Sequence, residues 1–160
     1  MSKGTIIYYG GFSLPDKSAS ANRVVSNGKI FDKLGYKTVF IGVTDESFDG
    51  LRPVQNQENM FEHSHPKSTK EWLRHMLSVE HIESVIKNHD DVCRIILYNV
   101  PMFTLMKAKK VFSKIGIEVC YDCTEWTGVT EGSLPKRILE FSRFLTKFLS
   151  AILLMKLPTE

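Results

Sequence analysis

Short apolar runs, separated by polar segments that contain glycine, divide the first part of the chain into strands and helices. The run Thr5–Tyr9 is rich in β-branched and aromatic residues and stops at Gly10-Gly11, which predicts a buried strand. Apolar residues then recur with helical spacing from about Ala19 to Leu34, where Gly35 predicts the helix end. A second apolar run, Tyr36–Val43, predicts another strand. The order strand, helix, strand is typical of a right-handed crossover within a parallel sheet.

The second part of the chain continues the alternation. Residues 45–67 are polar, contain prolines and show no clear period, so we expect a long loop there. A helical region over 68–88, in one or two pieces, precedes a predicted strand over Val92–Val100. A helix is expected between Pro101 and Gly116, because proline favours the first helical turn, and Ile117–Asp122 is expected to be the next strand.

These elements predict an α/β fold, namely a Rossmann-like open, mostly parallel sheet with helices on both faces. The 160 residues match the size of one domain. We assign residues 1–133 to the Rossmann-like body and residues 134–160 to a C-terminal helix of the same domain. Ligands of such sheets bind at the carboxyl ends of the strands, so the candidate chemistry is sought in the loops that follow them.

The net charge of +3 is concentrated in the C-terminal segment. A nucleic-acid-binding protein would show a broader basic surface, so no nucleic-acid partner is expected. The predicted helix over 134–157 is basic and amphipathic, and its apolar run Ala151–Met155 is too short to span a bilayer. Two placements stay open for this helix: on a membrane surface as a peripheral contact, or packed against the sheet or another domain.

Cysteine and histidine provide little catalytic chemistry in this pattern. Three cysteines are too few for a disulfide scaffold, which favours a reducing, cytoplasmic compartment. Cys120 and Cys123 have C-x-x-C spacing, but residues three apart on a strand point to opposite faces, so no metal or redox site is expected. No nucleophile–base pair can be assembled, so catalytic residues remain unassigned. The histidines are expected to be surface groups; they are His63, His65, His75, His81 and His89.

Several residues at the predicted strand ends are candidates for binding a ligand. Gly10 and Gly11 allow a ligand to approach the backbone closely, although an ordinary turn explains them equally well. Arg23 is able to reach an anionic group through its planar guanidinium, or to lie in solvent. The run Asp122–Trp126 places two carboxylates, Asp122 and Glu125, before Trp126. Carboxylates bind sugar hydroxyls and a tryptophan ring packs on a sugar face, whereas a capping Asp and a core Trp are the alternative.

Two segments resemble a known family. The stretch from Gly10 to Val24, with Gly-Gly-Phe-Ser-Leu-Pro-Asp-Lys at its start, and the stretch Leu34–Gly42 resemble the N-terminal domain of bacterial family 4 glycosyltransferases, which are retaining enzymes of the GT-B fold. Asp122-Cys123-Thr124-Glu125-Trp126 is similar to an Asp-x-Thr-Glu-Trp signature of the same domain. The resemblance covers nearly the whole chain.

The resemblance implies that the chain is one half of a GT-B fold, the half that carries the acceptor. It implies a nucleotide-sugar donor as substrate, bound by a second domain with the Gly10-Gly11 loop lining the cleft beside the donor phosphates, and a glycan or lipid-linked acceptor. It implies neither metal nor other cofactor, and a role in bacterial surface polysaccharide synthesis at the inner face of the cytoplasmic membrane. Gly10 and Gly11 become the leading substrate-binding candidates, followed by Arg23, Asp122, Glu125 and Trp126.

The sequence also departs from the family. Thr127 stands where the family usually has Tyr, and the chain reaches Glu160 without a Glu-x7-Glu motif in a donor-site context. Sugar transfer needs donor and acceptor held together in one cleft, so we expect the chain alone to be inactive. Three explanations stay open: a deliberately shortened protein, a split gene product that needs a donor-domain partner protein, or a remnant. The alternative is a non-catalytic Rossmann-like binding module that acts through a partner protein or the membrane surface. A third hypothesis is a nucleotide-binding domain of another Rossmann type.

Overall fold

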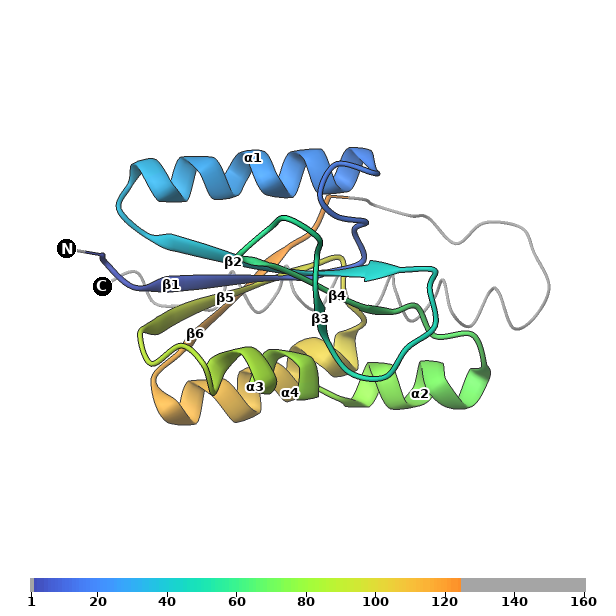
Figure 1. The fold of residues 1–160 in the computed structure, drawn as a ribbon. Helices are drawn as coiled ribbons and strands as arrows, with labels where there is room; N and C mark the ends of the chain where they lie inside the picture. The colour runs from blue at the N-terminus through green and yellow to red at the C-terminus, as the bar shows by residue number, and fades with distance from the viewer. Residues whose placement is uncertain (1, 125–160) are drawn as a thin grey trace.

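The computed structural model describes residues 2–124, and Figure 1 shows them as one sheet with helices on both sides. The elements are, in chain order, β1 (Thr5–Gly10), α1 (Ala19–Lys33), β2 (Lys37–Thr44), β3 (Arg52–Pro53), β4 (Met60–Ser64), α2 (Thr69–Leu77), α3 (Glu80–Ile86), β5 (Val92–Tyr98), α4 (Met102–Phe112), a 3-10 turn (Ser113–Ile115) and β6 (Glu118–Asp122). This architecture confirms the predicted Rossmann-like open, mostly parallel sheet.

The sheet has the strand order β3-β4-β2-β1-β5-β6, with β1 and β2 at its centre. All neighbouring strands are parallel except β3, which pairs antiparallel with β4. The chain leaves β1 toward β2 and leaves β5 toward β6, so the direction of winding reverses between β1 and β5. In open α/β sheets this reversal opens a crevice at the carboxyl ends of the two strands, where ligands bind.

Two apolar cores lie on opposite faces of the sheet. Figure 1 shows α1 over one face and α2, α3 and α4 over the other. Alternate residues of β1 serve the two cores: Tyr8 belongs to the core beneath α1, and Tyr9 belongs to the core beneath the other helices. Every residue of β1 is buried, as expected for a central parallel strand covered on both faces. Ser18 caps α1 by accepting a hydrogen bond from the backbone N–H of Ala21 at 3.1 Å.

The prediction of a long loop over residues 45–67 is wrong, because this segment contributes β3 and β4 to the sheet. The buried positions of β4 are not purely apolar, since Glu62 and His63 are both buried. Arg52 on β3 compensates the buried Glu62 carboxylate, with its Nε at 2.8 Å and its Nη2 at 2.6 Å from Glu62 Oε1. Because two of its buried positions hold polar residues, β4 lacks the continuous apolar run from which a strand could have been predicted.

The remaining expectations about the C-terminal part lie outside the described residues. These are the helix over 134–157, its membrane or protein contact, and the placement of Glu125 and Trp126. Within residues 2–124 no helix combines the length and the apolar character needed to cross a bilayer.

Gly10 and Gly11 differ in what surrounds them. Gly10 ends β1 opposite Tyr98 of β5, and a Cβ at Gly10 would collide with the backbone carbonyl of Tyr98. The two strands can therefore approach each other here only if no side chain is present. Gly11 is exposed, and a Cβ there would have no atom within 4 Å. Gly10 is required by sheet packing, whereas Gly11 leaves open space above the carboxyl edge.

Substitution of the two glycines separates these roles. We expect Gly10→Ala to lower the free energy of unfolding by about 1–3 kcal/mol, because the methyl group meets backbone that cannot move aside. We expect Gly11→Ala to leave stability unchanged or to raise it by at most about 1 kcal/mol, because its space is open and its φ is not left-handed. Urea unfolding measures both changes, and equal costs at the two positions would contradict the assignment.

Candidate functional site

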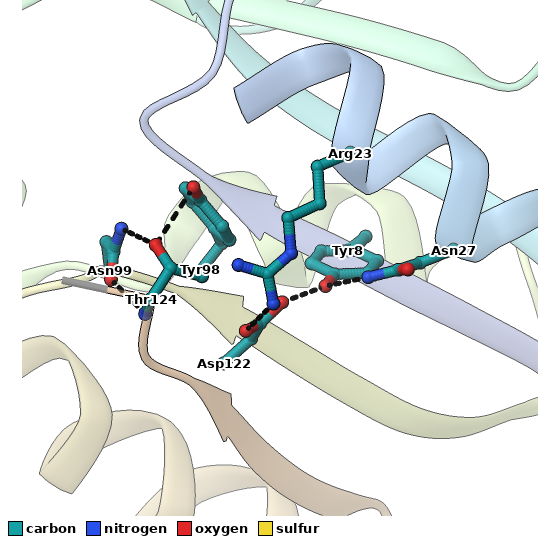
Figure 2. Close-up of polar contacts among 7 residues, drawn as sticks. All are labelled: Tyr8, Arg23, Asn27, Tyr98, Asn99, Asp122 and Thr124. Atoms are coloured by element: carbon teal, nitrogen blue, oxygen red, sulfur yellow. Dashed lines mark hydrogen bonds and ion pairs between the residues drawn. The ribbon is translucent and has the colours of Figure 1, made fainter. Parts of the chain in front are cut away.

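A polar network centred on Asp122 lies at the carboxyl edge of the sheet, beneath α1 (Figure 2). The Tyr8 hydroxyl donates a hydrogen bond to Asp122 Oδ2. Arg23, from α1, donates from Nη2 to Asp122 Oδ1 at 3.0 Å. Asn27, one helical turn after Arg23, donates from Nδ2 to the Tyr8 hydroxyl at 3.3 Å. The network thus joins α1, β1 and β6 through one carboxylate.

A second set of hydrogen bonds fixes the loop ends beside this network (Figure 2). Asn99 follows β5 with a left-handed φ of 48°, a conformation that asparagine tolerates better than most residues. Its Nδ2 donates to Thr124 Oγ1 at 2.9 Å, and its Oδ1 accepts from the Thr124 N–H at 3.2 Å. Thr124 Oγ1 in turn donates to the Tyr98 hydroxyl at 3.1 Å. The ends of β5 and β6 are therefore tied to each other by side chains as well as by the sheet.

Within this network Tyr8 stays protonated, and both carboxylate oxygens of Asp122 accept hydrogen bonds. Burial, followed by the hydrogen bond to Asp122, raises the pKa of Tyr8 well above its usual value. The side chain of Asp122 is 16% exposed and both of its oxygens already accept hydrogen bonds. Arg23 is 47% exposed, and its guanidinium carbon lies 5.9 Å from the centre of the Tyr98 ring. The exposed part of the guanidinium is therefore the portion of this network that faces solvent.

The structure brings together four of the six residues predicted to bind a substrate. Gly10, Tyr98 and Asp122 are aligned across β1, β5 and β6 by the strand register, and Arg23 reaches Asp122 from above. Gly11 follows at the same edge. Glu125 and Trp126 lie outside the described residues.

A pocket of about 550 Å³ lies at the same edge but on the opposite face of the sheet. Its walls come from the end of β4, from α2 and α3, and from the segment after β2. Four histidines line it: His63, His65, His75 and His81. Three of them form a cluster centred on His63, whose ring lies 4.4 Å from that of His81 and 5.1 Å from that of His75, centre to centre. The ring of Tyr9, at 5.8 Å, stacks on His63 from β1.

The expectation that the histidines are surface groups is wrong for this cluster. His63 is only 2% exposed, and His75 and His81 are partly buried. Burial, followed by repulsion from a charged His81, lowers the pKa of His63 to about 3 and that of His75 to about 4. Burial also lowers the pKa of His81. His75 and His81 both contact His63 because they belong to two different helices, α2 and α3.

Other members of both sites had no clear signal in the sequence. Tyr8 and Tyr98 read as ordinary strand residues, and only the strand register places their hydroxyls near Asp122 and Thr124. Asn27 follows Arg23 by four residues, a spacing that puts both on one helix face and that could have indicated it. No group of histidine, cysteine, aspartate and glutamate within residues 2–124 has an arrangement able to hold a metal ion.

No protein-family model matches this chain, and neither any curated protein nor any solved structure matches it. A function for these two sites therefore rests on their geometry and chemistry.

Removal of the Asp122 carboxylate tests the network. We expect Asp122→Ala to lower the free energy of unfolding by about 1–3 kcal/mol, because it leaves the Tyr8 hydroxyl with no acceptor. In a Tyr8→Phe background the same substitution should cost at least about 1 kcal/mol less. Arg23→Gln should cost about 1 kcal/mol or less, because its ion pair is half exposed. Urea unfolding of this double-mutant cycle measures the coupling, and additive effects would contradict a Tyr8–Asp122 bond.

The histidine cluster predicts a stability that depends on pH. The folded-state pKa values lie below the usual value near 6.5, so the unfolded chain binds more protons as the pH falls. Stability should be complete above about pH 6.5 and decrease below it, by about 1.4 kcal/mol per pH unit for each histidine that stays neutral. Urea unfolding at pH 7 and pH 5 measures the slope. His81→Gln should flatten it, whereas His89→Gln, outside the pocket, should not; equal slopes for the two variants would contradict the assignment.

Proposed function

We propose that this chain provides the acceptor-side domain of a glycosyltransferase that uses a nucleotide-sugar donor, and that it acts in bacterial surface polysaccharide synthesis. The observation that carries the proposal is the open space above Gly11 at the point where the winding of the sheet reverses. Parallel α/β sheets bind ligands at this point, and a residue without a side chain lets a ligand approach the backbone.

The chemistry beside Gly11 is compatible with a sugar or phosphate ligand. Arg23 keeps half of its side chain in solvent next to the Tyr98 ring, which suits an anionic group approaching from that side. Asp122 positions this guanidinium instead of acting as a free carboxylate. In this proposal Gly10 and Asp122 shape the site and Gly11 and Arg23 meet the ligand. The roles of Glu125 and Trp126 remain those implied by the family resemblance.

Binding of nucleotide sugars at Gly11 tests this function. Amide NMR spectra of the full chain are recorded during titration with UDP-glucose, UDP-N-acetylglucosamine, GDP-mannose and a short-chain lipid-pyrophosphate-linked sugar. We expect saturable shifts of the Gly11 amide and its neighbours with at least one of these compounds. Gly11→Val should weaken the binding at least tenfold without loss of stability, because the added side chain fills open space. Ser113→Val is the positional control, since Ser113 is exposed, has helical backbone angles and precedes β6 at the opposite edge.

Two outcomes would replace the proposal. Saturable shifts with NAD but not with any nucleotide sugar would favour a nucleotide-binding domain of another Rossmann type. No shift with any of these ligands, together with co-sedimentation with anionic vesicles, would favour a non-catalytic binding module. The observation that favours this last function is the saturation of Asp122, because both of its carboxylate oxygens accept hydrogen bonds without a ligand.

A further inference from the structure

The pocket that contains His63, His75 and His81 is separate from the site at Gly11. Tyr9 lines it from the core beneath α2–α4, whereas the Asp122 network lies in the layer beneath α1. The two sites share the carboxyl edge of the sheet but open on opposite faces. An inference about the pocket is therefore independent of the function proposed for Gly11.

His63 carries a buried acceptor that no described residue satisfies. Its Nδ1 lies 3.0 Å from the backbone carbonyl of Ser64, which can only accept, so Nδ1 bears the proton. The neutral ring then presents a lone pair at Nε2. This atom is buried and has no hydrogen-bond partner among residues 2–124. A buried polar atom without a partner is unfavourable, so a hydrogen-bond donor entering the pocket would find an acceptor already desolvated.

The two neighbouring histidines add both kinds of hydrogen-bonding group. His75 and His81 contact other rings, but within the described part of the chain neither ring forms a hydrogen bond. Each neutral imidazole presents one N–H donor and one lone-pair acceptor. A hydroxyl group matches this pair, because it donates and accepts at once. A carboxylate offers only acceptors and an ammonium group only donors, so either would leave half of these nitrogens unpaired.

The charge and geometry of the lining exclude two other classes of ligand. Asp49, Glu71 and Glu80 line the pocket against a single guanidinium, Arg74, so the lining is acidic overall and disfavours a phosphate or carboxylate ligand. The rings of His63 and His81 are nearly parallel, at 12°. Lone pairs in stacked rings do not converge on one point, so these two histidines cannot both bind one metal ion.

We propose that this pocket binds a neutral polyhydroxyl ligand, a sugar or polyol, with one hydroxyl donating to Nε2 of His63. His75 and His81 exchange hydrogen bonds with adjacent hydroxyls, and the carboxylates of the lining accept from others. The volume of about 550 Å³ accommodates a ligand of one or two sugar rings.

The protonation state of His63 provides the first test. Long-range ¹⁵N–¹H spectra of the full chain at pH 7 assign the proton on each imidazole nitrogen. We expect Nδ1 of His63 to be protonated and Nε2 to be a bare acceptor. A proton on Nε2 would overturn the proposal before any ligand is added.

Titration with defined probes provides the second test. The same spectra are recorded with methyl glucoside, methyl mannoside, methyl galactoside, N-acetylglucosamine, rhamnose and myo-inositol, each up to 50 mM, and with inorganic phosphate. We expect at least one neutral compound to shift the ring signals of His63, His75 and His81 saturably, and phosphate to leave them unchanged. No saturable shift with any neutral compound, or saturation by phosphate, would overturn the proposal.

Variants connect the binding to the cluster. His63→Phe keeps the ring stack and removes Nε2, and should weaken binding at least tenfold. His81→Phe, at a less buried position, makes the same test if the first variant is too unstable. His89→Phe introduces the same change outside the pocket and should bind like the wild type. Binding unaffected by either pocket variant would contradict the proposal. The Gly11 site is tested separately with nucleotide sugars and a lipid-linked sugar, so failure of this proposal is distinguishable from failure of the proposed function.

Discussion

One carboxylate, that of Asp122, determines how the helix above the sheet meets the carboxyl edge. It accepts from Tyr8 on the central strand and from Arg23 on α1, so it joins three elements that are far apart in the sequence. The Tyr8 hydroxyl is buried and needs an acceptor, which makes the position of β6 depend on β1 by more than sheet hydrogen bonds. The same carboxylate keeps Arg23 directed toward Asp122 at the edge that Gly11 also borders.

The two faces of the carboxyl edge differ in whether their buried polar groups have hydrogen-bond partners. Above the sheet, Tyr8 donates to Asp122, and Thr124 forms hydrogen bonds with Asn99 and Tyr98. Below the sheet, the ring of His63 stacks on that of His81 and contacts the tilted ring of His75, and the Nε2 of His63 is left without a partner within residues 2–124. A saturated network rigidifies its surroundings, whereas an unsatisfied one favours association with an external donor.

Most of the fold could be predicted from the sequence, and the failures have a common cause. β1, β2 and β5 were predictable because covered parallel strands are continuous apolar runs, as in Ile95–Tyr98. β4 was not, because its buried positions hold Glu62 and His63, whose burial depends on Arg52 and on rings from other elements. The position of Asp122 at the carboxyl edge was predictable from its place at a strand end. Its partner Tyr8 was not, because the contact exists only once the register across β1, β5 and β6 is set.

The short strand β3 has a consequence for how this sheet can associate with other chains. It covers the side of β4 with only two residues, and one of them, Pro53, has no N–H with which to continue a ladder. The other residue, Arg52, forms an ion pair with Glu62 of β4. Such features discourage edge-to-edge aggregation, so any extra strand, from this polypeptide or from a different one, would be directed to the far border formed by β6.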